Sequence, residues 1–346
     1  MRFCRFGIAI CASMLSLGAS FAQTTSPSAD LVAKAKAEGK VVWYAAPGTR
    51  DAVKESFAVW QARYPGIQIE MVESSGPENM ERIRAERRAS RPVADLVSLG
   101  DIAAFQFASE NAYRELDTQA MPNFKMLSAK LLPVLDPQRR HIPTYVQAYG
   151  IMVNSQIVSE ADMPKRWTDL LNPKYSRKIG LHDFSRVGGG GVWLMIGLPA
   201  LGEEFFKTLV KQQMRLFGRS QEMISAVARG ERSIGIPGNS GGVADNPGAP
   251  LKLIYPEDGA FFISINTGAV ALAPHPAAAT LFLDFLLGPE AQALFSKEGN
   301  LPIRDDIPTK GLSLATAKFL GVGFQTPADA PKIKQVLDFG TKLLAP

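Results

Sequence analysis

The stretch from His182 to Leu194 holds residues whose types and spacing suit the binding of an anion. Ser185 and Arg186 come shortly before four glycines at positions 188–191. A helix is expected to begin here, because the Ser185 hydroxyl can cap its first turn. Glycines have no Cβ, so several N–H groups can approach one anion at the positive end of a helix, and Arg186 adds a planar cation. The alternative is a flexible loop, or a tight helix–strand contact that requires small residues.

Short polar turns also follow the strands that the sequence predicts at 67–72, 214–217 and 233–236. In open α/β sheets, ligands bind at the carboxyl ends of the strands. We therefore expect a ligand site built from small polar and basic residues at these strand ends. The candidates are Ser74, Ser75, Ser185, Arg186, Gly188, Gly189, Arg219, Ser220, Asn239 and Ser240.

The elements that must position these residues indicate an α/β fold. Three times in the first half of the chain, a strand is followed by a polar turn and a helix, which predicts a parallel sheet with helices on both faces. The second half repeats this order. Strands are predicted at 40–44, 67–72, 94–98, 143–153, 179–181, 214–217, 233–236, 251–255 and 261–272, and helices at 26–38 (capped by Ser26), 51–63, 78–89, 100–111, 192–198, 203–212, 221–228, 276–295 and 330–344.

Residues 1–22 have the pattern of a secretory signal peptide: two arginines, a short apolar core at 6–17 and a small-residue cleavage site. The apolar core is too short to span a membrane as a mature helix. Both cysteines, Cys4 and Cys11, lie in this segment, and Ile10 directly before Cys11 disfavours a lipoprotein anchor. We therefore expect a periplasmic protein without a lipid anchor, disulfides or thiol chemistry.

The charge of the chain excludes some classes of partner. The formal net charge of +5 falls to about +3 when the two arginines of the signal peptide are removed, and so mild a charge argues against nucleic-acid binding. The arginine-rich segment 81–91 is interpreted as a solvated helix face with ion pairs such as Arg82 with Glu86. Docking to a permease is the alternative role for this segment.

Two separated segments are similar to signatures of ABC-transporter solute-binding proteins. Residues 148–154 (AYGIMVN) and 167–175 (WTDLLNPKY) resemble the middle signature, and residues 275–292 (HPAAATLFLDFLLGPEAQ) and 301–304 (LPIR) resemble the C-terminal one. The similarity covers nearly all of the chain after the signal peptide. The subgroup it resembles contains binders of ferric ion, thiamine, polyamines, phosphonates and sugar phosphates.

The resemblance implies a two-lobe, type II periplasmic-binding-protein fold with two crossovers and a ligand cleft between the lobes. Lobe 1 is expected at 23–144 plus 262–305, and lobe 2 at 149–260 plus the C-terminal tail 306–346. Hinges are expected at 144–148 and 261–264. The implied partners are a small-molecule ligand and the permease and ATPase subunits at the inner membrane, with the protein itself a monomer. Near the hinges, Tyr145 and Gln147 could line the cleft floor, and Asp258 could accept a bond from the ligand or only form a turn.

The sequence departs from the pattern of the iron-binding relatives. Those proteins carry two adjacent tyrosines after the strand at 233–236, where this chain has Pro237-Gly238-Asn239-Ser240. Ser185, Arg186 and Gly188 match the positions of the anion-binding loop of those relatives. We therefore expect an organic anion as ligand (a phosphonate, phosphate ester or carboxylate), with Arg186→Ala weakening its binding at least tenfold.

Three other functions were weighed against this one. Ferric iron or an iron chelate is an alternative ligand, and a sensor for a membrane receptor kinase is an alternative role. An enzyme is disfavoured, because no cysteine follows the signal peptide and the three histidines, His141, His182 and His275, are scattered in sequence. No resident cofactor or metal is expected.

Overall fold

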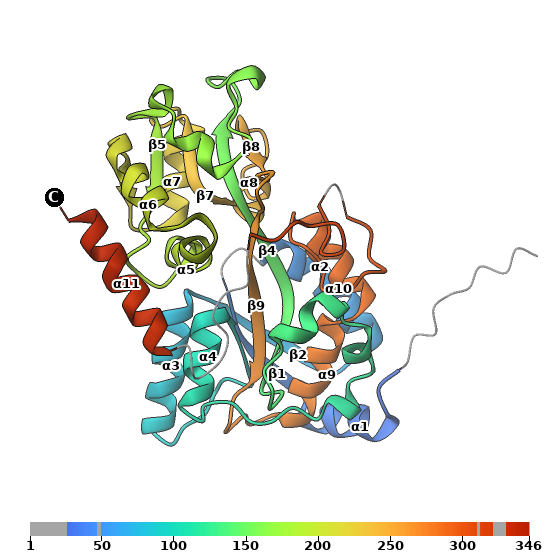
Figure 1. The fold of residues 1–346 in the computed structure, drawn as a ribbon. Coiled ribbons are helices and arrows are strands. Elements are labelled where there is room, and N and C mark those ends of the chain that lie inside the picture. Colours follow the sequence, from blue (N-terminus) through green and yellow to red (C-terminus); the bar gives the residue numbers. More distant parts are fainter. Residues whose placement is uncertain (1–25, 47–49, 310–311, 321–329, 346) are drawn as a thin grey trace, which may run out of the picture.

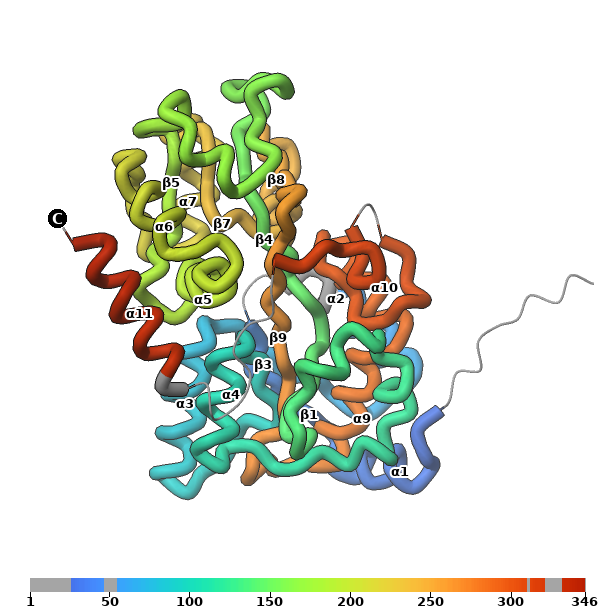
Figure 2. The backbone as a smooth tube through the Cα atoms, in the orientation of Figure 1, coloured from blue at the N-terminus to red at the C-terminus, as the bar shows by residue number. Residues whose placement is uncertain are grey.

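The computed structural model describes residues 26–46, 50–309, 312–320 and 330–345, so the signal peptide predicted at 1–22 lies outside the described residues. The chain forms two lobes (Figure 1). Lobe 1, the lower one in Figure 1, contains α1–α4, β1–β3, α9 and α10, and lobe 2 contains α5–α8 and β5–β8. Figure 2 shows that the strands β4 and β9 cross from one lobe to the other.

Within the described residues, one mixed sheet of nine strands runs through both lobes. Its order is β2-β1-β3-β9-β4-β7-β5-β6, with β8 paired to β4. The strands at each end of this order pair in parallel, but β9 and β4 run antiparallel to their neighbours, so the sheet is mixed and not wholly parallel as predicted. The strands are β1 (Lys40–Ala45), β2 (Gln68–Glu73), β3 (Leu96–Gly100), β4 (His141–Asn154), β5 (Ile179–His182), β6 (Arg215–Phe217), β7 (Ile234–Asn239), β8 (Leu251–Ile254) and β9 (Phe261–Ala269).

Helices cover both faces of the sheet, as predicted (Figure 1). They are α1 (Ala29–Glu38), α2 (Arg50–Arg63), α3 (Gly76–Arg88), α4 (Asp101–Ser109), α5 (Gly189–Leu201), α6 (Glu203–Leu209), α7 (Ser220–Ala228), α8 (Ser240–Ala244), α9 (Pro276–Leu286), α10 (Pro289–Lys297) and α11 (Ala330–Leu344). Short 3-10 turns lie at Thr118–Ala120, Pro122–Met126, Ala129–Val134, Glu160–Asp162, Trp167–Leu171, Pro173–Tyr175 and Val210–Gln212.

Each face of the lobe 1 sheet has its own core, because successive strand residues point to opposite sides. On one face, Trp43 packs edge-on against Phe282 of α9, with ring centroids 5.6 Å apart. On the other face, the next residue, Tyr44, packs with residues of α3 and α4 such as Phe107. Lobe 2 repeats the arrangement, with Trp193 in one core and Met152 in the other.

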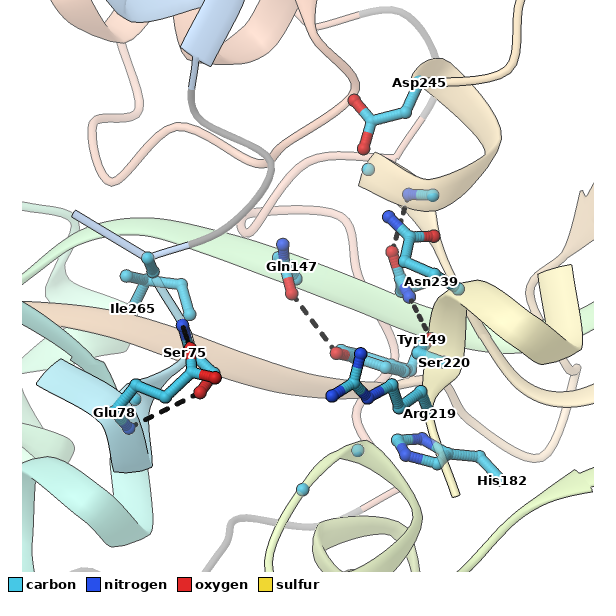
Figure 3. A pocket seen from close by; sticks show the side chains of 17 residues that line it. Ser75, Glu78, Gln147, Tyr149, His182, Arg219, Ser220, Asn239, Asp245 and Ile265 are labelled. Carbon is cyan, nitrogen blue, oxygen red and sulfur yellow. Dashed lines mark hydrogen bonds between the residues drawn. The ribbon is translucent and has the colours of Figure 1, made fainter. Parts of the chain in front are cut away.

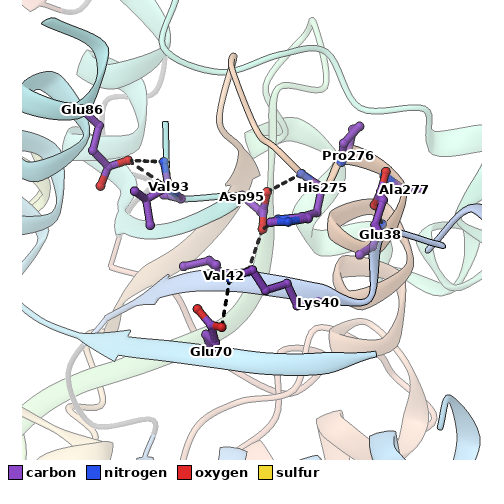
Figure 4. Close-up of polar contacts among 12 residues, drawn as sticks. Glu38, Lys40, Val42, Glu70, Glu86, Val93, Asp95, His275, Pro276 and Ala277 are labelled. Atoms are coloured by element: carbon purple, nitrogen blue, oxygen red, sulfur yellow. Dashed lines mark hydrogen bonds and ion pairs between the residues drawn. The ribbon is translucent and has the colours of Figure 1, made fainter. Parts of the chain in front are cut away.

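A buried carboxylate ties distant segments of lobe 1 together (Figure 4). Asp95 is fully buried and accepts hydrogen bonds from the Val42 amide at 2.7 Å and from the His275 amide at 2.7 Å. Its other contact is Nδ1 of His275 at 2.8 Å. Nearby, the Glu38 carboxylate accepts from the first amides of α9. His275 therefore has a structural role in joining α9 to the sheet.

The structure corrects three details of the predicted elements. Helix α1 is capped by Ser28 and begins at Ala29, so the predicted cap at Ser26 is wrong. Helix α5 begins at Gly189 after the cap residue Gly188, so Ser185 is not its cap. The tail after residue 306 does not pack with lobe 2 alone: Leu314 lies in a lobe 1 core, and it is α11 that packs against α5 of lobe 2.

Candidate functional site

A cavity of about 600 Å³ lies between the two lobes (Figure 3). Residues from lobe 1, from lobe 2 and from the crossing strands β4 and β9 all contribute to its wall. They are Ala46, Ser75, Gly76, Glu78, Gln147, Tyr149, His182, Gly188, Gly189, Arg219, Ser220, Gln221, Asn239, Gly241, Gly242, Asp245 and Ile265. The volume is typical of sites that hold a small molecule.

The start of α5 opens onto this cavity from the lobe 2 side. Its cap residue is Gly188, which has no side chain with which to bond the first amides of the helix. The first N–H groups of any helix lack partners inside the helix and carry the positive end of its dipole. Gly188 and Gly189 both line the cavity, so the first residue of α5 and its cap lie at the cavity wall.

The glycine run divides into two pairs with different surroundings. A Cβ on Gly190 would lie 2.3 Å from the His182 carbonyl oxygen, and one on Gly191 would lie 2.0 Å from the Arg186 carbonyl oxygen. These two glycines are needed because the helix packs tightly on the turn before it. This is the alternative given above, a close contact that requires small residues. A Cβ on Gly189 would instead meet the Tyr149 ring at 3.0 Å, at the cavity wall.

The start of α7 opens onto the same cavity. Arg219 is the cap residue of this helix and forms no side-chain capping bond, and the next residue, Ser220, begins the helix. Among the described residues, the exposed Arg219 guanidinium has no hydrogen bond or ion pair. Figure 3 shows it pointing toward the middle of the cavity. Arg219 is thus a cation with free donors beside a helix N-terminus.

Asn239 joins two of the helix starts in lobe 2. Its Oδ1 accepts from the Gly242 amide at 2.6 Å, which caps the short helix α8. Its Nδ2 donates to the Ser220 hydroxyl at 3.2 Å. Asn239 therefore holds Ser220 in place and leaves the hydroxyl proton of Ser220 free to turn toward the cavity.

The lobe 1 wall carries a helix start that is already satisfied. The Ser75 hydroxyl accepts from the Glu78 amide at 3.4 Å, and the Glu78 carboxylate accepts from the Ser75 amide at 3.0 Å. This reciprocal pair is a capping box at the start of α3. Hydrogen bonding with Ser75, and to a smaller extent the charge of Arg219, lower the pKa of Glu78.

The floor of the cavity is formed by side chains of β4 and β5. The Tyr149 hydroxyl donates to Oε1 of Gln147 at 3.2 Å, and the Tyr149 ring stacks on Phe261 with centroids 4.8 Å apart. His182 lies at the end of β5, and burial lowers its pKa, so the ring is neutral at pH 7. Its Nδ1 is buried and has no protein partner among the described residues.

The structure brings six of the predicted ligand residues to this cavity, and Gln147 with them. The six are Ser75, Gly188, Gly189, Arg219, Ser220 and Asn239. Ser185 and Arg186 are close in sequence but outside the wall. The carboxylate of Asp183 accepts from the Ser185 hydroxyl at 2.6 Å and lies 3.2 Å from Nε of Arg186, whose side chain is 76% exposed.

Four further predicted residues lie elsewhere. Tyr145 is fully buried and stacks on Phe295 of α10, with centroids 4.7 Å apart, so it does not form the cleft floor. Asp258 accepts from the Trp167 amide at 3.1 Å, a contact within lobe 2. The Ser74 carbonyl accepts from the Asn79 side chain, and the Ser240 hydroxyl accepts from the Ala148 amide at 3.3 Å. Each of these residues is engaged in holding the fold.

Sequence reasoning missed several residues of the wall. Tyr149 could have been found, because it lies two positions after Gln147 and every second residue of a strand points to the same face. His182 is the last residue of β5 and so stands at a strand end like the predicted residues. Glu78 carried a capping-box signal with Ser75, three positions earlier. Asp245 and Gln221 had no such signal.

In the described ranges, no group of three or more histidine, cysteine or acidic side chains is placed to hold a metal ion. Within the same ranges, no helix combines the length and apolar character needed to cross a membrane.

Comparison with known proteins identifies a family. The profile of the family described as bacterial extracellular solute-binding protein matches residues 91–325, more than half of the chain. A curated relative, the spermidine/putrescine-binding periplasmic protein 1 of Haemophilus influenzae, is 24% identical over 204 residues. That match spans 56% of this chain and 56% of the relative, so the chain covers little more than half of the relative's length.

Solved structures share the fold over most of the chain. AfuA of Actinobacillus pleuropneumoniae, with fructose-6-phosphate bound, matches with a TM-score of 0.72 at 20% identity, over 89% of this chain and 99% of AfuA. Iron-bound HitA of Pseudomonas aeruginosa matches with a TM-score of 0.68 at 18% identity, over 88% of this chain and 99% of HitA. These likenesses confirm the predicted two-lobe, type II periplasmic-binding-protein fold.

Proposed function

Because the chain belongs to the family of bacterial extracellular solute-binding proteins, we propose that it is the substrate-binding component of an ABC importer. In this proposal the ligand is a small organic anion: a phosphonate, a phosphate ester or a carboxylate. The protein binds it in the periplasm, closes its lobes around it and delivers it to the permease. It acts by binding, as a monomer, and not by catalysis.

The observation that carries the anion proposal is the pair of open helix starts in lobe 2. Helices α5 and α7 have 13 and 9 residues, and neither has a side-chain cap on its first amides. Both starts line one cavity, and the guanidinium of Arg219, the cap residue of α7, has no hydrogen bond or ion pair with any described residue. An anion there would receive backbone donors from two helix ends and charge-assisted bonds from arginine.

Closure of the lobes would complete the site. Ser75 and Glu78 face Arg219 from the lobe 1 side of the cavity, and the charge of Arg219 reaches Glu78. Hinge closure about β4 and β9 would bring this wall over the ligand, exclude water and strengthen the electrostatic contacts. The closed form would then present the surface that the permease recognises.

A polyamine is a second candidate ligand. Two carboxylates, those of Glu78 and Asp245, line the cavity, and the stacked Tyr149 ring could contact an ammonium group. The curated relative named above is a polyamine-binding protein. Against this candidate, Glu78 is already engaged in the capping box, and Arg219 would repel a cation.

A thermal-shift screen followed by calorimetry tests the proposal. The panel contains inorganic phosphate, methylphosphonate, phenylphosphonate, fructose 6-phosphate, citrate, putrescine, spermidine and ferric citrate. A ligand that binds only the folded state raises its stability by about 2.7 kcal/mol at a hundredfold excess over Kd. Stabilisation by one of the anions supports the proposal. Stabilisation by the polyamines alone, unchanged in Arg219→Ala, overturns it in favour of the second candidate.

A further inference from the structure

A second cavity, of about 460 Å³, adjoins the ligand cavity between the lobes. The two share the wall residues Gly76, Gln147, Tyr149, Gly188, Gly189 and Ile265. A molecule bound at the start of α5 therefore lies at the boundary between the two spaces. The second cavity extends from this boundary between α3, α4 and α5, which lie near one another in Figure 1.

The wall of the second cavity is mainly apolar. Met80 comes from α3, Ile102 and Ala103 from α4, Val192 from α5 and Ile263 from β9. All five belong to the hydrophobic clusters of the two lobes, so this cavity interrupts the packing between them. A ligand with an apolar group is favoured in such a space, because it removes the apolar wall from water.

The charged groups around the second cavity are already engaged. Arg84 pairs with Glu81 and with Glu110. The carboxylate of Asp101 accepts from the Ser264 amide at 3.0 Å and from the Asn266 side chain at 2.8 Å. Burial raises the pKa of Asp101 to about 6, so its carboxylate is still mostly ionised at pH 7 and is held by these two donors. This cavity thus offers no cation comparable to Arg219 for a second anion.

We propose that the ligand is an anion with an aryl or branched alkyl group, whose charged end binds at the starts of α5 and α7 while its apolar group fills the second cavity. The inference rests on the proposed anion site and narrows its substrate class. Highly hydroxylated anions such as sugar phosphates fit less well, because their hydroxyl groups would lose water at Met80, Ile102 and Val192 without gaining partners.

Calorimetry with two matched phosphonates tests the inference on the full mature protein. Methylphosphonate and phenylphosphonate share the charged group and differ in apolar size. We expect phenylphosphonate to bind at least tenfold more tightly, a difference of about 1.4 kcal/mol. In Ala103→Phe the new ring occupies the second cavity, so the advantage of phenylphosphonate should disappear while methylphosphonate binds as in the wild type. Ala161→Phe, at an exposed alanine in a distant turn, is the matched control and should keep the advantage.

The outcomes separate this inference from the proposed function. Equal binding of the two phosphonates by the wild type overturns the apolar subsite and leaves the anion site standing. An advantage for phenylphosphonate that survives in Ala103→Phe also overturns the subsite, because the aryl group must then lie elsewhere. Failure of both phosphonates and of every other anion to bind overturns the anion site and the subsite together.

Discussion

The two lobes face the same cavity but differ in how the helix starts that line it are capped. In lobe 1, α3 is capped by its own residues, since Ser75 and Glu78 exchange hydrogen bonds. In lobe 2, α5 and α7 begin at Gly188 and Arg219, neither of which forms a side-chain capping bond. At this cavity, the donors at the start of α3 are therefore satisfied, whereas those at the starts of α5 and α7 have no side-chain partner.

This difference suggests an order of events in ligand binding. In the proposed function, an anion would gain most from the uncapped starts in lobe 2, so we expect it to bind there first. The capped start of α3 offers no comparable gain, and its Glu78 carboxylate is negative. We expect lobe 1 then to contribute mainly by covering the ligand, with Arg219 attracted to both the ligand and Glu78.

The largest expected effect comes from removing the unpaired cation of lobe 2. Arg219→Ala should weaken the binding of a phosphonate or phosphate ester by about ten- to a hundredfold, which corresponds to about 1.4 to 2.7 kcal/mol. The variant should fold normally, because the side chain has no hydrogen bond or ion pair with any described residue. Isothermal titration calorimetry measures the change in Kd.

Arg186→Ala is the matched control for this variant. Arg186 pairs with Asp183, and the Arg186 side chain is 76% exposed. The tenfold loss of ligand affinity that the sequence predicted for Arg186→Ala is therefore expected for Arg219→Ala instead. We expect Arg186→Ala to change Kd by less than about twofold, since exposed ion pairs contribute little. The reverse ranking of the two variants would show that the turn at 183–186 refolds around the ligand and would break the comparison.

A smaller effect is expected from removing the cap in lobe 1. Ser75→Ala should lower the free energy of unfolding by about 1 kcal/mol, the usual contribution of a helix cap. Urea denaturation followed by circular dichroism measures this loss. The affinity for an anion should stay within about twofold of the wild type, because the cap serves the helix. A large loss of affinity at unchanged stability would instead show that the Ser75 hydroxyl turns to the ligand.

The smallest effect concerns His182, the partly buried histidine beside the start of α5. Because burial lowers the pKa of His182 below its ordinary value of 6.5, the unfolded chain binds more protons than the folded one as the pH falls through 6.5. The folded state therefore loses stability below about that pH. Between pH 7.5 and 5.5, the melting temperature of His182→Gln should fall less than that of the wild type. His141→Gln is the comparison, since burial lowers the pKa of His141 as well. Equal losses in wild type and His182→Gln would contradict this prediction.

The sequence predicted the elements better than the site, for a physical reason. Strand alternation and turn residues are local, so the strand ends and most helix ranges were found. Both arginines were predicted to bind the ligand, and the tenfold loss of affinity was expected at Arg186, although Arg219 follows its strand more closely. A local signal did exist: Asp183 lies three residues before Arg186 and binds it, whereas no acid lies close before Arg219.

Other errors depended on contacts that a local pattern does not contain. Tyr145, Gln147 and Tyr149 alternate along β4 and share a face, but α10 covers Tyr145 through Phe295. Asp258 is engaged by the Trp167 amide, from a segment far away in sequence. The role of a residue at the cleft thus depended on which distant element covered it, and that follows from tertiary packing.

The buried Asp95 has a consequence for the order in which the chain folds. Its carboxylate obtains part of its hydrogen bonding from His275, and lobe 2 is encoded between these two positions. A chain that emerges from its N-terminus has made β5–β8 and α5–α8 of lobe 2 before residue 275 is available, and of the described elements of this lobe only α11 follows later. Lobe 1 at that stage would enclose a carboxylate without those partners, at a cost in free energy. We therefore expect the strands of lobe 2 to acquire protection from hydrogen exchange earlier than those of lobe 1 while the chain is being synthesised, even though lobe 1 begins first in the sequence.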